Sequence, residues 1–166
     1  MGKARNKGIQ VHLFEKQYGQ ESLDLILGIQ RNEFHIPITA EDQPDLIDIQ
    51  GFYQKQNGNF WVAACESKVV GTIGLIDIGN HSAALRKMFV HAGFRGTGTA
   101  DMLLKTLLSW SETHGLRRIY LGTTSRFLAA HRFYEKSGFK EIPKRDLPHG
   151  FPVMEVDSKF YRMNLS

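Results

Sequence analysis

The chain has 166 residues, which is enough for one well-buried domain and short for two. Its 42% apolar and 23% charged residues are ordinary for a soluble globular protein. No apolar run approaches the roughly 20 residues that span a bilayer, and the basic segment 1–7 is not followed by the apolar stretch of a signal peptide. The single cysteine, Cys65, excludes an internal disulfide and suits a reducing cytoplasm, which is where we expect the protein.

Hydrophobic periodicity and turn residues divide the chain into alternating extended and helical segments. Gly, Pro and Asn mark most of the expected ends. In the first part of the chain we expect a strand at 9–14, a helix at 22–32, an apolar loop at 34–38, a helix from about 41 to 55, a hairpin of strands at 60–65 and 69–78, and a strand at 85–90. A glycine-rich turn at 95–100 then leads into a helix ending near 113–115, a strand at 118–122, and a helix capped by Ser125 and stopped by Gly138. The chain ends with an extended segment from Phe139, a proline-rich loop, and a closing strand at 153–165 with an irregularity at 157–158. This order predicts a single α/β domain over 1–166.

The most informative segment is the turn Arg95-Gly96-Thr97-Gly98-Thr99-Ala100, which joins an apolar strand to an amphipathic helix. A glycine-rich turn and the first turn of a helix direct several backbone N–H groups at one point, at the positive end of the helix dipole. Such an array binds a phosphate or pyrophosphate, to which Arg95 can add a charge-assisted contact. The alternative is a tight turn that uses its glycines only for backbone freedom. The spacing matches neither a P-loop nor a dinucleotide-binding fingerprint.

Two segments together resemble a known family. The turn fits the pattern Arg/Gln-x-x-Gly-x-Gly/Ala, and residues 130–139, Ala-His-Arg-Phe-Tyr-Glu-Lys-Ser-Gly-Phe, fit Ala-x-x-Leu/Phe-Tyr-Glu-Lys-x-Gly-Phe. In this order they resemble the GNAT family of acetyl-CoA-dependent N-acetyltransferases. The resemblance implies an α/β (α+β) fold whose central mixed, mostly antiparallel twisted sheet of six to seven strands is flanked by about four helices. It also implies acetyl-CoA as the acetyl donor, a small-molecule or peptide amine as the acceptor, and a homodimer as a common assembly.

Charge is distributed unevenly along the chain. Residues 86–145 hold 12 Lys/Arg against 4 Asp/Glu, whereas residues 1–85 hold 7 against 10. A basic half that contains the phosphate-binding turn favours a polyanion such as coenzyme A, and the other half favours a cationic amine. Alternatively, these charges only solvate helix surfaces. The basic residues are scattered and no nucleic-acid or metal-binding motif occurs, so we expect no nucleic acid, membrane or metal partner.

The resemblance also assigns roles to individual residues. In GNAT enzymes the amine attacks the thioester of acetyl-CoA directly in a ternary complex. The pantetheine arm is then expected beside the backbone of Met88, Phe89 and Val90, and the pyrophosphate over residues 95–100. Tyr134 matches the family's tyrosine near the sulfur, and a phenol with a pKa near 10 stays protonated at neutral pH and can serve as the general acid. The alternative for Tyr134 is a packing role in the interior.

The general base is not assigned by the resemblance. Many members carry a glutamate just before the cofactor strand, but residues 82–85 read Ser-Ala-Ala-Leu, and Phe127 stands where many members have an asparagine. Glu33, Asp77 and His81 are candidates because each lies in or beside a loop or strand end that can face the amine. Each is alternatively a solvated side chain, and a water relay can replace a dedicated base.

The acceptor is not encoded in any motif. By family analogy, the loop 33–38 and the segment 149–153 are expected to form the walls of the acceptor pocket, although their apolar residues serve core packing equally well. The leading hypothesis is an N-acetyltransferase. The missing glutamate supports an alternative, a non-catalytic acyl-CoA sensor, and a third hypothesis is an interaction domain that uses only the scaffold.

Overall fold

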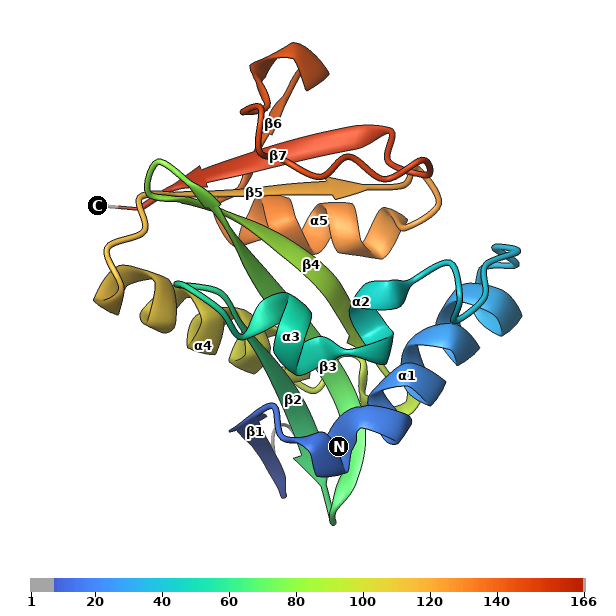
Figure 1. Ribbon diagram of the computed structural model, residues 1–166. Helices are drawn as coiled ribbons and strands as arrows, with labels where there is room; N and C mark the ends of the chain where they lie inside the picture. The colour runs from blue at the N-terminus through green and yellow to red at the C-terminus, as the bar shows by residue number, and fades with distance from the viewer. Residues whose placement is uncertain (1–7, 166) are drawn as a thin grey trace.

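The computed structural model of the protein describes residues 8–165 and contains one seven-stranded sheet in the order β1-β2-β3-β4-β5-β7-β6 (Figure 1). The strands are β1 (Ile9–Leu13), β2 (Asn59–Cys65), β3 (Lys68–Gly79), β4 (Ser82–Val90), β5 (Arg118–Thr123), β6 (Lys140–Ile142) and β7 (Lys159–Asn164). Every neighbouring pair is antiparallel except β4 and β5, which are parallel. The mixed, mostly antiparallel sheet that the resemblance implies is therefore confirmed.

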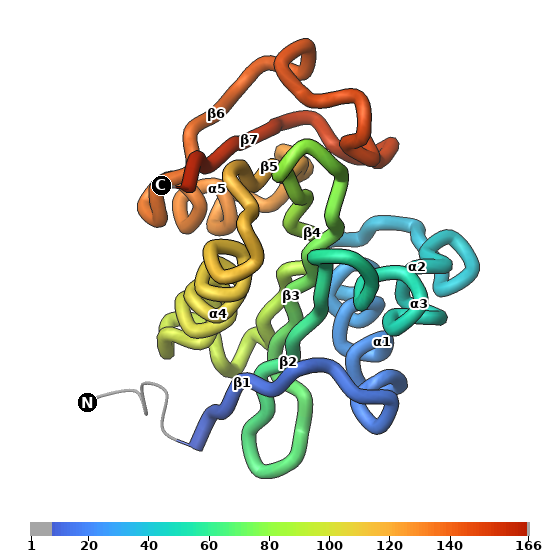
Figure 2. The backbone as a smooth tube through the Cα atoms, turned by 60° about the vertical axis from the view of Figure 1, so that its left-hand side comes forward, coloured from blue at the N-terminus to red at the C-terminus, as the bar shows by residue number. Residues whose placement is uncertain are grey.

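Helices cover both faces of this sheet (Figure 2). On one face lie α1 (Gly19–Leu27), α2 (Pro44–Ile47) and α3 (Ile49–Tyr53), and on the other lie α4 (Thr99–Thr113) and α5 (Leu128–Lys136). Shorter helical turns are η1 (Lys16–Tyr18), η2 (Gly28–Glu33), η3 (Ala92–Phe94) and η4 (Lys144–Asp146). None of the helices within residues 8–165 is long and apolar enough to cross a membrane. The segment 1–7, in which we expect no signal peptide, lies outside the described residues.

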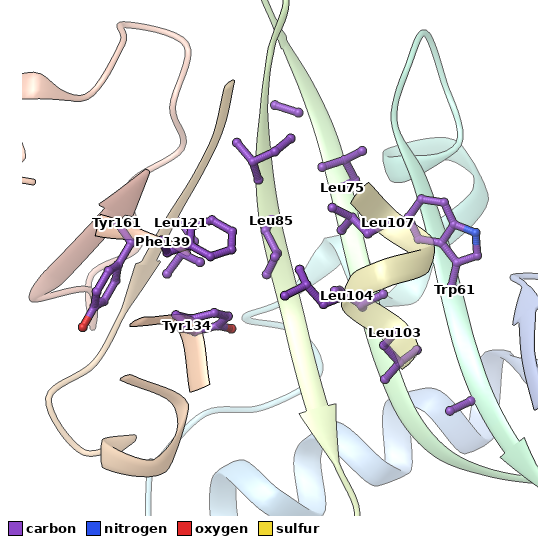
Figure 3. Packing of buried hydrophobic residues seen from close by; sticks show 14 of the residues in the cluster. Trp61, Leu75, Leu85, Leu103, Leu104, Leu107, Leu121, Tyr134, Phe139 and Tyr161 are labelled. Carbon is purple, nitrogen blue, oxygen red and sulfur yellow. The ribbon is translucent and has the colours of Figure 1, made fainter. Parts of the chain in front are cut away.

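Two of the three apolar clusters lie on opposite faces of the sheet. Under α4, Leu103, Leu104 and Leu107 repeat at helical spacing and are almost completely buried against the strands, as Figure 3 shows. Under α1–α3, a second cluster holds Ile26, Leu46, Ile49, Tyr53 and Phe60. Because helices cover both faces of the sheet, almost every residue of β2 is buried, and its sequence Asn-Phe-Trp-Val-Ala-Ala-Cys is correspondingly almost all apolar.

Two helical predictions differ from the structure in detail. The helix expected at 22–32 begins earlier, at Gly19, and continues into the π-helical turn η2. The helix expected from about 41 to 55 is two short helices, because Asp48 leaves the helical conformation and its carboxylate accepts the N–H of Gly51. The described part of the chain therefore has five α-helices where about four were expected.

Two predictions near the C-terminus are wrong. Ser125 does not cap α5, which begins at Leu128; instead the Ser125 N–H donates to the Ser158 hydroxyl. The closing strand does not begin at residue 153 but at Lys159, since the segment before it folds into a turn in which Asp157 accepts the N–H of Met154. This turn is the irregularity expected at 157–158, extended over the whole segment.

Candidate active site

The sheet opens between β4 and β5. Within residues 8–165 the two strands pair only where Ser82–Ala84 meet Arg118–Tyr120. Figure 1 shows the strands parting beyond this point. Met88, Phe89 and Val90 lie on the parted half of β4, each partly buried. The backbone groups of an unpaired strand edge are free to bond an extended ligand, as another strand would.

A bulge distorts β4 where it leaves β5. The register with β3 shifts between Thr72 and Gly74, and Lys87 in the bulge has a φ of 54°. The Thr72 hydroxyl donates to the Lys87 carbonyl at 2.8 Å and holds the bulge in place. A left-handed conformation costs a residue with a side chain roughly 1–2 kcal/mol, and such strain concentrates at functional sites.

A cavity of about 120 Å³ fills the opening. Its walls are the parted halves of β4 and β5, the start and inner face of α5, and the loop between β6 and β7. Side chains that precede β2 in the chain, those of Gln30, Ile38 and Gln43, complete the lining. The lining residues used below are Arg86, Lys87, Met88, Gly122, Tyr134 and Asp157. The apolar walls expected from the loop 33–38 and the segment 149–153 are present in part, as Ile38, Phe151 and Pro152.

Tyr134 stands at the inner wall of the cavity. It is 6% exposed, packs edge-on against Phe139, and its hydroxyl is directed toward β4 beside Leu85 (Figure 3). Desolvation raises the pKa of Tyr134 above its ordinary value. The phenol is therefore protonated at neutral pH, although the same desolvation makes it a weaker acid than a phenol in water.

The glycine-rich turn adopts the conformation that its glycines permit. Gly96 and Gly98 have φ values of 75° and 91°, and Gly98 precedes the first residue of α4. The Met102 N–H donates to the Gly98 carbonyl, so the N–H groups before it in the helix have no acceptor within the helix. These groups fit a pyrophosphate, and with the free edge of β4 they fit a nucleotide-bearing ligand with a long amide arm.

Replacing Gly98 by leucine should therefore weaken acetyl-CoA binding by about 10-fold or more, a loss of about 1.4 kcal/mol. A side chain at this φ is strained and also crowds the N–H array. Gly115→Leu is a matched control, because Gly115 has a φ of 75° at the other end of α4 with no atom within 4 Å of an added Cβ. Calorimetric titration should show lost affinity for the first variant alone, and equal affinity in both would contradict the assignment of the turn.

The Arg95 side chain is not free to contact a phosphate bound at the turn. Its Nε donates to the Val90 carbonyl at 3.0 Å and its guanidinium forms a two-pronged ion pair with Glu33. The predicted phosphate contact of Arg95 would therefore need this pair to open. Arg95 in the structure ties the end of β4 to η2.

The three base candidates lie outside the cavity. Glu33 is held by Arg95. His81 contacts the Gly115 carbonyl at 3.2 Å just before β4 begins, and Asp77 accepts the N–H groups of Asn57 and Gly79. The start of β4 at Ser82 is about 23 Å from Phe89 at the usual strand rise of about 3.3 Å per residue. The geometry places Tyr134 in the wall of the cavity, beside the parted half of β4, and places none of these three among the residues that line it.

Sequence reasoning missed a buried charge cluster beside the cavity. Asp45 is 3% exposed, and its Oδ2 lies 3.4 Å from Lys87 Nζ and 3.8 Å from Arg86 Nη2 and accepts the Tyr53 hydroxyl. Desolvation lowers the pKa of Lys87 to about 8, although Asp45 acts against the shift. The cluster joins α2 and α3 to β4, and no local spacing could have indicated it.

Asp157 was also missed as a site residue. Its side chain is half-buried in the cavity, and its Oδ2 accepts the Met154 N–H at 2.9 Å. Desolvation raises the pKa of Asp157, while Arg86 and Lys87 lower it to a lesser degree. Its only sequence signal was the expected break in the closing strand. Among residues 8–165 no group of three or more His, Cys, Asp and Glu side chains is arranged to hold a metal ion.

Comparison with known proteins agrees with this geometry. The sequence model of the acetyltransferase (GNAT) family matches residues 23–139. The crystal structure of a GNAT-family acetyltransferase from Staphylococcus aureus Mu50 is 41% identical, has a TM-score of 0.93, and covers 95% of this chain and 99% of that chain. N-acetylaspartate synthetase from Xenopus tropicalis is 40% identical over 102 residues, which are 59% of this chain and 37% of the relative. The same enzyme from Danio rerio is 34% identical over 127 residues, 74% of this chain and 45% of the relative.

The chain thus spans less than half the length of these two synthetases. The family match nevertheless covers most of the chain, and the S. aureus structure matches it almost end to end. The chain belongs to the GNAT family of acetyltransferases.

Proposed function

We propose that the chain transfers the acetyl group of acetyl-CoA directly to the amino group of a small amino acid with an acidic side chain. The observation that carries the proposal is the Tyr134 hydroxyl, directed at the parted half of β4 inside the cavity. Acetyl transfer from acetyl-CoA requires a proton donor for the leaving sulfur, an edge that aligns the amide arm and a site for the pyrophosphate. A cytoplasmic location, in which Cys65 stays reduced, is part of the proposal.

Bound acetyl-CoA supplies a thioester whose carbonyl carbon accepts the amine. The turn around Gly98 holds the pyrophosphate through its N–H groups, and the edge of β4 from Met88 to Val90 aligns the amide arm. Backbone N–H groups of the same edge polarise the thioester oxygen. The Tyr134 hydroxyl then gives its proton to the leaving sulfur, which prevents the reverse reaction.

The acceptor class is supported by charge in the cavity wall. Arg86 and Lys87 both line it, and each is nearly buried, with 10% and 8% of the side chain exposed. Beyond the long 3.8 Å contact with Asp45, the partners of Arg86 within residues 8–165 are weak ones, the Met154 sulfur and the face of Phe52. Its guanidinium therefore keeps donors for a carboxylate. The sequence similarity to two N-acetylaspartate synthetases points to the same class.

The test is release of free thiol from acetyl-CoA in the presence of aspartate, glutamate, alanine, spermidine and a tripeptide. We expect the acidic amino acids to give a kcat/KM about 10-fold or more above alanine, because a charged hydrogen bond contributes about 1.5–3 kcal/mol. A preference for spermidine or for the tripeptide would overturn the acceptor class. Tight acetyl-CoA binding without turnover of any amine would instead support the non-catalytic sensor.

A further inference from the structure

The transfer leaves the ammonium proton of the acceptor amine without an acceptor among the residues that have been given a role so far. An aliphatic amine is an ammonium ion at neutral pH and cannot attack a carbonyl until it loses a proton. Of the residues that line the cavity in the described part of the chain, Asp157 is the one carboxylic acid. The remaining ionisable side chains there are Arg86, Lys87 and Tyr134, which already have the roles argued above.

The Asp157 carboxylate lies against the parted half of β5. A Cβ added to Gly122 would stand 2.6 Å from Asp157 Oδ2, so the glycine makes room for the carboxylate at the strand. Gly122 follows the short stretch in which β5 is paired with β4. The carboxylate is therefore at the opening of the sheet, on the opposite wall from the β4 edge.

Hydrogen bonding fixes the orientation of the Asp157 side chain and leaves one of its carboxylate oxygens able to accept a further hydrogen bond. Oδ2 accepts the Met154 N–H, and the Asp157 N–H donates to the Met154 carbonyl, so the residue closes a tight turn. A carboxylate has two oxygens with about four acceptor sites. Oδ1 is left for a second donor, such as an ammonium group that enters from the cavity.

We propose that Asp157 is the general base that takes the proton from the acceptor ammonium. One N–H bond of the ammonium breaks, an O–H bond forms on the carboxylate, and the electron pair stays on nitrogen, which then forms the bond to the acetyl carbon. As the C–S bond breaks, the sulfur takes the proton of the Tyr134 hydroxyl, and the second proton that leaves the nitrogen restores that hydroxyl. The proposal rests on the acetyl transfer proposed above. It assigns to the loop between β6 and β7 the role that the missing glutamate has in many family members.

The charges around Asp157 suit this role. Burial raises the pKa of its carboxyl, which makes the carboxylate a stronger base, while Arg86 and Lys87 of β4 favour the ionised form. Asp45 of α2 lies beside the same two cations. Lys87, with a pKa lowered to about 8, is the competing base, but its ammonium is 3.4 Å from Asp45 and is paired there.

The test is the variant Asp157→Asn, because an asparagine oxygen can still accept the Met154 N–H and keep the turn. We expect kcat/KM to fall by about 100-fold or more, with melting temperature and acetyl-CoA affinity unchanged. The pH profile should change as well: wild-type activity levels off once the base is ionised, whereas the variant should gain rate with rising pH as free amine accumulates. Glu155→Gln, an exposed acid in the same loop, is the matched control and should behave as wild type.

Three results separate the claims. A variant Asp157→Asn with nearly wild-type kcat/KM and an unchanged pH profile overturns the assignment of Asp157 alone. So does a variant Lys87→Gln that loses the acidic limb of the pH profile while Asp157→Asn retains it, because the base is then Lys87. Absence of turnover in the wild-type protein with every amine overturns the proposed function and the base together.

Discussion

Replacement of Tyr134 by phenylalanine is expected to lower kcat by about 100-fold, the usual size of a general-acid contribution. The hydroxyl is the group directed at β4, while the ring packs against Phe139 and stays in place in the variant. Acetyl-CoA affinity should therefore remain, because the turn and the β4 edge are unchanged. Steady-state kinetics and a calorimetric titration of the same preparation measure both quantities.

Tyr161→Phe provides the matched control for this prediction. Tyr161 is also buried in the same cluster, but its hydroxyl donates to Glu135 at 2.7 Å and does not line the cavity. Its loss should reduce stability slightly and leave kcat unchanged. Full kcat in Tyr134→Phe, or an equal loss in both variants, would contradict the role of Tyr134 as the proton donor.

The variant Asp45→Asn is expected to lower the free energy of unfolding by about 3–5 kcal/mol, because removal of one partner leaves buried charge without compensation. The amide oxygen can still accept the hydrogen bond from the Tyr53 hydroxyl, so the loss of stability measures the removal of the negative charge and not a change in packing. Arg86 and Lys87 would both remain nearly buried with no anion beside them except Asp157. Urea denaturation monitored by circular dichroism measures the change.

Asp24→Asn is the control for Asp45. Asp24 is exposed on α1 and accepts one hydrogen bond from Gln20 four residues away, so its replacement should cost less than about 0.5 kcal/mol. A loss below about 1 kcal/mol for Asp45→Asn would mean that water compensates the two cations and that the cluster is not a buried one.

The sequence predicted those parts of the site that are formed by residues consecutive in the chain. The turn at 95–100 and the helix that carries Tyr134 each have a local pattern, and both have the predicted conformation apart from the start of α5. Strand order follows less directly, since it depends on which edges pair across long loops. The family resemblance implied a mixed, mostly antiparallel sheet, which the structure confirms, but the order of the strands was not predicted.

The two aspartates of the site, Asp45 and Asp157, could not be identified from the sequence for a physical reason. Asp45 meets Lys87 across 42 positions of the chain, and Asp157 meets Gly122 across 35, so neither contact leaves a periodic signal. Glu33 and Arg95 illustrate the converse. Each was selected for its own position in the chain, whereas the fold pairs the two with each other.

A crystal structure of the protein with acetyl-CoA would show directly whether the turn and the β4 edge bind the donor. We expect the pyrophosphate on the backbone N–H groups between Gly96 and Ala100, the amide arm along Met88–Val90, and the sulfur within reach of the Tyr134 hydroxyl. Acetyl-CoA bound elsewhere, or a β4 edge that closes onto β5 while the ligand stays outside, would contradict this expectation.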